Sequence, residues 1–79
     1  MEKSKAYVLI EVAAGLVPGV VESLGKIDGV LYANAITGQY DVLAAIEAPD
    51  INQLGKISYG EIQRIEGVLR TITCNVVKL

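Results

Sequence analysis

The chain has no histidine, tryptophan or phenylalanine, and its 79 residues include a single cysteine, Cys74. A structural zinc site takes four ligands, mainly cysteine and histidine, so one copy of this chain cannot build one. One cysteine also excludes a framework of disulfides within the chain. Cys74 lies in an apolar pattern typical of a strand, where we expect it to be a small buried side chain. We therefore expect neither a metal nor another cofactor.

Long apolar runs and an excess of basic charge are also missing. No uninterrupted apolar segment approaches the roughly 20 residues that a membrane span needs, and residues 1–5 lack the pattern of a signal peptide. Seven Lys and Arg against nine Asp and Glu give a net charge of −2. Because nucleic-acid binding needs clustered basic residues, this charge argues against direct DNA or RNA contact. The sequence predicts a cytoplasmic protein without membrane contact.

The residues that are present indicate one globular domain over 1–79, since 52% of them are hydrophobic. Runs rich in apolar and β-branched residues predict strands at 6–13, 30–37, 40–47 and 68–77. Apolar side chains at helical spacing predict helices at 17–27 and 51–65. Pro18 fits the first turn of the first helix, and Asp50 is suited to cap the second. Gly55 and Gly60 in the second helix indicate either close packing or local looseness.

One segment of the sequence is repeated. Residues 26–31 and 64–69 both read base, Ile, acid, Gly, Val, Leu, and Gly29 and Gly67 suit the left-handed conformation beyond a helix end. The order of elements then consists of two β-α-β halves, each with a right-handed crossover. This order predicts an α+β, ferredoxin-like βαββαβ fold. It has an antiparallel four-stranded sheet with both helices on one face.

Both faces of the predicted sheet are apolar. One set of alternate positions holds Ala6, Val8, Ile10, Val12, Val30, Tyr32, Ile36, Val42, Ala44 and Ile46. The other set holds Tyr7, Leu9, Leu31, Ala33, Ala35, Leu43 and Ala45. Helices cover only one face, and the alternation leaves open which set they cover. The other face exceeds the apolar patch that a monomer tolerates, so we predict that two copies pack sheet against sheet. The alternative is a plain surface rich in alanine.

The segment Thr37-Gly38-Gln39-Tyr40-Asp41 lies between two apolar runs and predicts a β-hairpin. Gly38 supplies the permissive backbone of its turn. A hydroxyl, a phenol and a carboxylate beside exposed backbone N–H groups are suited to hold a small zwitterion. The alternative is an ordinary turn, in which Tyr40 opens a strand and Asp41 binds a nearby N–H group. The residues alone leave both interpretations open.

With these elements in place, the chain resembles the effector-binding domain of the Lrp/AsnC family of regulators, also called the RAM domain. Three places carry the resemblance: Thr37-Gly38-x-Tyr40-Asp41 in the hairpin, Gly67-Val68-Leu69-Arg70-Thr71-x-Thr73 at the last strand, and the helix 50–64. The resemblance covers essentially the whole chain. It implies a domain that dimerises through its sheets, with dimers assembling into rings, commonly octamers of four dimers. Amino acid effectors would bind in the clefts between neighbouring dimers.

The resemblance also implies the site residues, which are Thr37, Gly38, Tyr40, Asp41, Thr71 and Thr73. Gly38 would offer backbone N–H groups near the effector carboxylate, Asp41 would face its ammonium group, and Tyr40 would form part of the pocket wall. Thr37 would add a polar contact, as would Thr71 and Thr73 from an adjacent chain. The sequence does not name the amino acid.

The chain departs from the family pattern at its N-terminus. Family regulators carry a helix-turn-helix DNA-binding domain there, whereas only residues 1–5 precede the first predicted strand. We therefore expect a stand-alone effector domain without a DNA-binding domain. Under one hypothesis it co-assembles with a full-length Lrp/AsnC regulator, and under another it acts as a sensor or carrier for a different partner.

Three other functions stay open at this point. One is a ferredoxin-like dimeric enzyme of the monooxygenase or isomerase type, although the chain has no histidine and no paired acids for acid–base chemistry. Another is the ACT type of amino-acid-sensing domain, and the third is a purely structural ring former. The hairpin and the Thr-x-Thr strand favour the non-catalytic Lrp/AsnC-type module over the ACT type, whereas the sequence leaves the structural ring former open.

Overall fold

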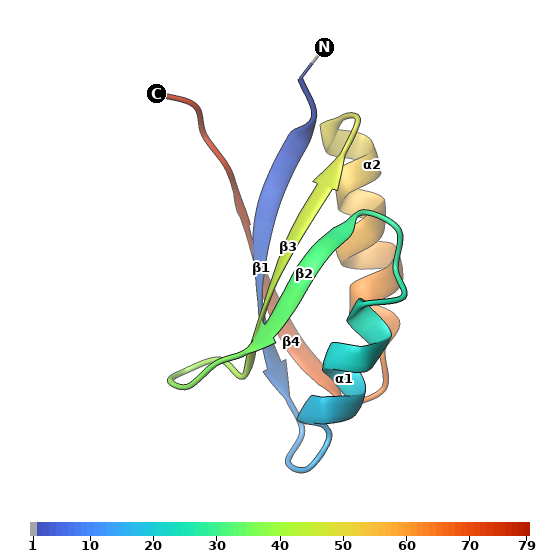
Figure 1. The fold of residues 1–79 in the computed structure, drawn as a ribbon, viewed down its shortest axis with the longest axis vertical. Helices are drawn as coiled ribbons and strands as arrows, with labels where there is room; N and C mark the ends of the chain where they lie inside the picture. The colour runs from blue at the N-terminus through green and yellow to red at the C-terminus, as the bar shows by residue number, and fades with distance from the viewer. Residues whose placement is uncertain (1) are drawn as a thin grey trace.

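The computed structural model describes residues 2–79, so the Met1 end of the predicted domain lies outside the described residues. The elements are β1 (Ser4–Val12), α1 (Val17–Leu24), β2 (Val30–Ala35), β3 (Val42–Ala48), α2 (Ile51–Gly55), η1 (Lys56–Glu61), η2 (Ile62–Arg64) and β4 (Val68–Asn75). One antiparallel sheet has the strand order β2-β3-β1-β4. Both helical layers cover the same face (Figure 1), which confirms the ferredoxin-like βαββαβ prediction. Within residues 2–79, every helix is too short or too polar to cross a membrane.

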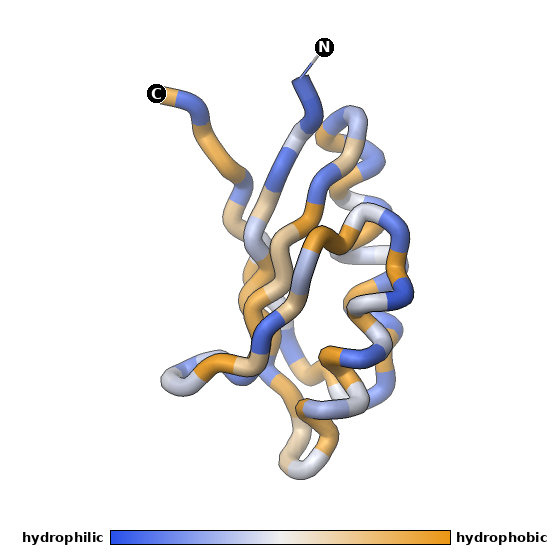
Figure 2. Tube along the Cα trace, viewed as in Figure 1, coloured by the Kyte–Doolittle hydropathy of each residue, from blue (hydrophilic) through white to orange (hydrophobic). Residues whose placement is uncertain are grey.

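The core lies between the helices and the two central strands, along which apolar residues dominate (Figure 2). From the sheet it takes Ala6, Val8, Ile10 and Val12 of β1 and Val42, Ala44, Ile46 and Ala48 of β3. From the helical side it takes Val20, Leu24, Leu54, Ile57 and Ile62. A fully buried Val, Leu or Ile side chain contributes about 1.5–3 kcal/mol. The alternate residues of β1 and β3 are therefore the main apolar contribution of the sheet to stability.

The repeated sequence builds the same turn twice. Gly29 has φ +96° and Gly67 has φ +100°, the left-handed conformation predicted for both. In each turn the amide of the following valine donates to the carbonyl of the isoleucine, over 3.2 Å from Val30 to Ile27 and 3.1 Å from Val68 to Ile65. Both isoleucines pack against the core. Each turn therefore leads the chain from a helix into an edge strand, β2 or β4.

The first helix is shorter than predicted. It ends at Leu24 and not at Ile27. Beyond it, tighter bonds continue the turn, with the Lys26 amide 3.1 Å from the Ser23 carbonyl and the Ile27 amide 3.2 Å from the Leu24 carbonyl. The apolar spacing extended the predicted helix because such i to i+3 turns place side chains almost as an α-helix does.

The sequence predicted one regular α-helix for the second helical segment, but the structure has three shorter helical segments there. Five residues of α2 are followed by six residues of π-helix in η1 and three of 3-10 helix in η2. Asp50 caps α2 as expected, because its carboxylate accepts the Gln53 amide at 2.8 Å. A Cβ built at Gly55 or Gly60 meets no atom within 4 Å. Close packing therefore does not explain these glycines, and their weak helix propensity favours local departure from α geometry.

A bulge at the start of β2 corrects the predicted faces of the sheet. Val30 pairs with Ile46, but the next pair is Tyr32 with Ala45, so Leu31 is an extra residue. One extra residue moves the following side chains to the opposite face. Tyr32 therefore lies on the open face, away from the helices, and Ala33 packs against the core. Strict alternation along the sequence had grouped Tyr32 with Val8 and Val30, and Ala33 with Tyr7.

The open face is apolar and uncovered in the single chain. Tyr7, Leu31, Tyr32 and Ile72 are 43%, 52%, 48% and 41% exposed. Tyr7 and Tyr32 both pair with Ala45 from opposite sides, and Ala45 is only 4% exposed. The pKa of Tyr32 is raised, mainly because the side chain is partly desolvated. The charge and hydrogen bond of Tyr7 raise this pKa further. The two tyrosines thus cover the middle of this face.

Cys74 corrects a second prediction. It pairs with Tyr7 in register, on the edge strand β4, and it is exposed. The apolar strand pattern around Cys74 is genuine, but the face on which it lies has no helices over it. An exposed thiol at this position reports on whether another surface covers the open face.

We expect Gly29→Ala to destabilise the fold strongly. The left-handed conformation costs an alanine about 1–2 kcal/mol, and its Cβ would also approach the Ile57 side chain and lie 2.9 Å from the Glu47 carbonyl oxygen. The matched control is Gly55→Ala, which meets open space in a helix and should stabilise by about 0.5–1 kcal/mol. Urea unfolding at one protein concentration measures both. Equal free energies of unfolding for the two variants would contradict the turn assignment.

Candidate functional site

The β2–β3 connection, residues 36–41, contains the predicted site motif. Both strands are shorter than predicted, because β2 ends at Ala35 and β3 begins at Val42. The loop is closed by a bond of 2.9 Å from the Ile36 amide to the Asp41 carbonyl. It projects from the end of the sheet, away from the helix layer (Figure 1). Gly38, with φ +112°, has no atom within 4 Å of its Cβ position, so the backbone there is open to a ligand.

Asp41 joins the loop to the central strand. Its Oδ2 accepts the Val12 amide at 2.8 Å, and its own amide donates to the Ile10 carbonyl at 2.9 Å. The carboxylate therefore continues the β1–β3 ladder ahead of Val42, where β3 begins, with a charge-assisted bond. This is the structural role that the sequence left open for Asp41. Because the bond uses Oδ2, Oδ1 is left for a second donor.

Tyr40 contacts Arg70, a residue for which the sequence predicted no role. The Arg70 guanidinium donates to the Tyr40 hydroxyl over 3.5 Å, and its carbon lies 5.9 Å from the ring centroid. Arg70 belongs to β4 and pairs with Glu11 of β1. Tyr40 and Arg70 are 30 positions apart in the sequence, so no local pattern predicted their contact. The only signal was the place of Arg70 within the quoted strand motif.

The two threonines of β4 do not lie in the hairpin loop. Thr71 pairs with Ile10 and Thr73 with Val8, so both share the helix side of the sheet with these core residues. The Gln63 side-chain amide donates to the Thr71 hydroxyl over 3.0 Å. One chain thus gathers Thr37, Gly38, Tyr40 and Asp41 in one loop and keeps Thr71 and Thr73 apart from them. Their approach from an adjacent chain stays a prediction.

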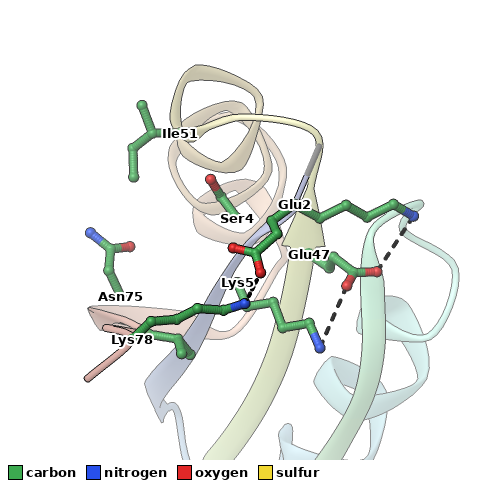
Figure 3. Close-up of a pocket in the computed structure, with 9 residues that line it drawn as sticks. Glu2, Ser4, Lys5, Glu47, Ile51, Asn75 and Lys78 are labelled. Carbon is green, nitrogen blue, oxygen red and sulfur yellow. Dashed lines mark hydrogen bonds and ion pairs between the residues drawn. The ribbon is translucent and has the colours of Figure 1, made fainter.

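A hollow lies at the other end of the sheet, lined by residues from near both termini (Figure 3). Its volume is about 610 Å³, and it is lined by Glu2, Lys3, Ser4, Lys5, Glu47, Ile51, Asn75, Val76 and Lys78. Lys3 and Lys5 both pair with Glu47, at 3.6 and 3.7 Å, and Lys78 pairs with Glu2. Exposed pairs of this kind contribute about 0–1 kcal/mol. No sequence motif pointed to this hollow.

A smaller hollow of about 270 Å³ lies beside β4 and is lined by Gln63, Val68, Leu69, Arg70 and Thr71. Residues 2–79 bring together no group of three acidic, cysteine or histidine side chains suited to a metal ion. The groups gathered at the hairpin can recognise a ligand by charge and hydrogen bonds. A carboxylate, a guanidinium, a phenol and open backbone amides are its groups.

Comparison with known proteins identifies the class of domain. Residues 5–78 match the family model described as the Lrp/AsnC ligand binding domain. The chain is 33% identical, over 54 residues, to an uncharacterized HTH-type transcriptional regulator of Pyrococcus furiosus. That match covers 68% of this chain and 36% of the regulator. The matched segment therefore corresponds to little more than a third of the relative.

Solved structures agree with the fold. A protein of Thermus thermophilus superposes with a TM-score of 0.90 at 28% identity, covering 96% of this chain and 95% of that one. A transcriptional regulator of Neisseria meningitidis, solved as a complex with L-Met, superposes with a TM-score of 0.83 at 22% identity. That likeness covers 95% of this chain and 50% of the regulator.

We expect Asp41→Ala to lower the free energy of unfolding by about 1.5 kcal/mol, the lower range for a hydrogen bond to a charged group. The loss follows because the Val12 amide is left without its acceptor. Asp41→Asn keeps an acceptor oxygen and should cost less. Asp28→Ala, at an exposed site, is the control and should stay within about 0.5 kcal/mol of wild type. Chemical unfolding that ranks Asp41→Ala with Asp28→Ala would refute the structural role.

Proposed function

Because the chain belongs to the Lrp/AsnC ligand-binding domain family, we propose that it is a non-catalytic module that binds an amino acid at the hairpin loop and acts in transcription regulation. The observation that carries the proposal is the loop itself. A carboxylate, a phenol and an open glycine backbone lie together on a segment that projects from the sheet. The L-Met complex of the Neisseria relative supports an amino acid as the effector class.

An amino acid effector needs partners for both of its charges. Asp41 is suited to the ammonium group, since Oδ2 is held by Val12 and Oδ1 is left for a charge-assisted bond. Backbone N–H groups around Gly38 are suited to a carboxylate, in the manner of a nest. Tyr40 would form a wall and Thr37 would add a hydroxyl. Each of these groups comes from the one loop.

We also propose that two copies pack through their open faces. The exposed side chains Tyr7, Leu31, Tyr32 and Ile72 form an apolar surface that a second copy would remove from water. Pairs would then assemble into a larger ring, such as an octamer, with effector clefts between dimers. In such a ring Thr71 and Thr73 of one copy would approach the hairpin of another. The complete site would then be shared between chains.

The regulatory part of the proposal rests on the relatives, whose names describe HTH-type transcriptional regulators. This chain, with seven basic against nine acidic residues, lacks the charge for its own nucleic-acid contact. We propose that it acts in the cytoplasm through a full-length Lrp/AsnC regulator, whose assembly or effector response it would change. Mixed assemblies of the two chains would be the physical route.

The test of effector binding is thermal unfolding against each common amino acid at one protein concentration. A ligand at 100 times its dissociation constant should stabilise the fold by about 2.7 kcal/mol, a shift of several degrees. The shift should vanish in Asp41→Asn and persist in Asp28→Asn, which removes the same charge at an exposed position outside the loop. If no amino acid shifts the wild-type midpoint, the structural ring former becomes the better explanation.

The test of the open-face dimer uses the single thiol. Cys74 is exposed in one chain and lies beside Tyr7 on the open face, so pairing of the faces should protect it from maleimide. We expect the labelling rate to fall as protein concentration rises through the association range measured by sedimentation. Labelling in urea gives the unprotected rate. A labelling rate that does not change as the copies associate would show that they contact each other through another surface.

A further inference from the structure

Arg70 is placed beside the proposed effector loop by the register of the sheet. It pairs with Glu11 of β1, and these paired residues share the open face because Leu9, Tyr7 and their β4 partners alternate with the core positions. The Asp41 carboxylate is bound to Val12, the next residue of β1. Since β3 and β4 flank β1, Asp41 and Arg70 stand roughly 10 Å apart, two strand spacings. The Arg70 side chain then bends toward Tyr40.

The contacts that Arg70 makes leave most of its binding capacity unused. A guanidinium carries five N–H donors, and one of them reaches the Tyr40 hydroxyl at 3.5 Å, the outer limit for a hydrogen bond. The distance of 5.9 Å to the ring is likewise at the outer limit of a cation–π contact. The ion pairs formed within residues 2–79 involve lysines, and none includes Arg70.

The charges around the loop are ordered. Asp41 supplies a negative group next to Tyr40 in the loop, and Arg70 supplies a positive group that contacts the Tyr40 hydroxyl. A planar guanidinium binds a carboxylate through two parallel hydrogen bonds. The backbone amides of an open loop hold a carboxylate less firmly. An α-amino acid carries an ammonium and a carboxylate on one carbon. The two side chains therefore present complementary charges to the two ends of this ligand.

We propose that Arg70 is the residue that binds the effector carboxylate, and that Asp41 and Arg70 together select ligands with a free α-carboxylate beside an α-ammonium group. The inference rests on the proposed function and deepens it, because it moves carboxylate recognition from the Gly38 backbone to a side chain of β4. Tyr40, which contacts the Arg70 guanidinium, positions it. The ligand class is the free amino acid, and its amide, ester and decarboxylated amine should bind more weakly.

The experiment titrates wild type with the common L-amino acids and then with the carboxamides of those that bind, for example L-leucinamide beside L-leucine. Wild type should prefer the acid over the amide by at least tenfold. Arg70→Gln should weaken the acid by tenfold or more and leave amide binding unchanged. Arg70→Lys should recover part of the affinity for the acid, because it restores the charge without the planar pair of donors.

The matched control is Arg64→Gln, which removes the same charge from an exposed position in η2 and should bind the acid as wild type does. Arg70 is itself exposed, so its variants should unfold at the wild-type midpoint without ligand. Equal binding of acid and amide by wild type would overturn the inference and leave amino acid binding intact. Equal loss of acid and amide in Arg70→Gln would also overturn it, since Arg70 would then only support the loop. Failure of every amino acid to bind wild type would instead overturn the proposed function.

Discussion

A four-stranded sheet with two helical segments can hide only one of its faces, and the rest of this structure follows from that limit. Alternate residues of β1 and β3 pack under the helices and leave almost no exposed surface. Their neighbours on the same strands, including Tyr7, face away and stay partly in water. The hairpin loop projects toward that uncovered side (Figure 1), and Arg70 reaches it from the same face. The proposed dimer surface and the proposed effector loop thus lie on the same side of the molecule.

Local patterns were enough to predict the fold. Apolar runs predicted the strands and helical spacing predicted the helical segments, and the repeated segment at 26–31 and 64–69 encodes turns whose conformations agree closely. The cap at Asp50 follows from one side chain and one amide three residues away. Within the candidate site, the grouping of Gly38, Tyr40 and Asp41 was predictable because the three residues are adjacent in sequence.

The features that were not predicted depend on events that the sequence pattern does not contain. One bulged residue, Leu31, reverses the faces of the residues after it, and alternation carries no mark of a bulge. The π-helical segment follows Gly55 and contains Gly60, and the helical spacing of apolar residues does not distinguish it from an α-helix. The contact of Arg70 with Tyr40 exists only because β4 lies next to β1. Cys74 is exposed because its face is uncovered, a property of the layers and not of the strand.

The strand order has a consequence for how the chain folds. β1 is made first, yet both of its neighbours come later, β3 through the pair Ile10–Val42 and β4 through the pair Tyr7–Cys74. Closing such long loops costs entropy before any pairing rewards it. The β2–β3 hairpin is the one local pairing in the sheet. During synthesis β1 can pair with β3 once residue 48 has been made, but the opposite edge of β1 stays open until β4 follows.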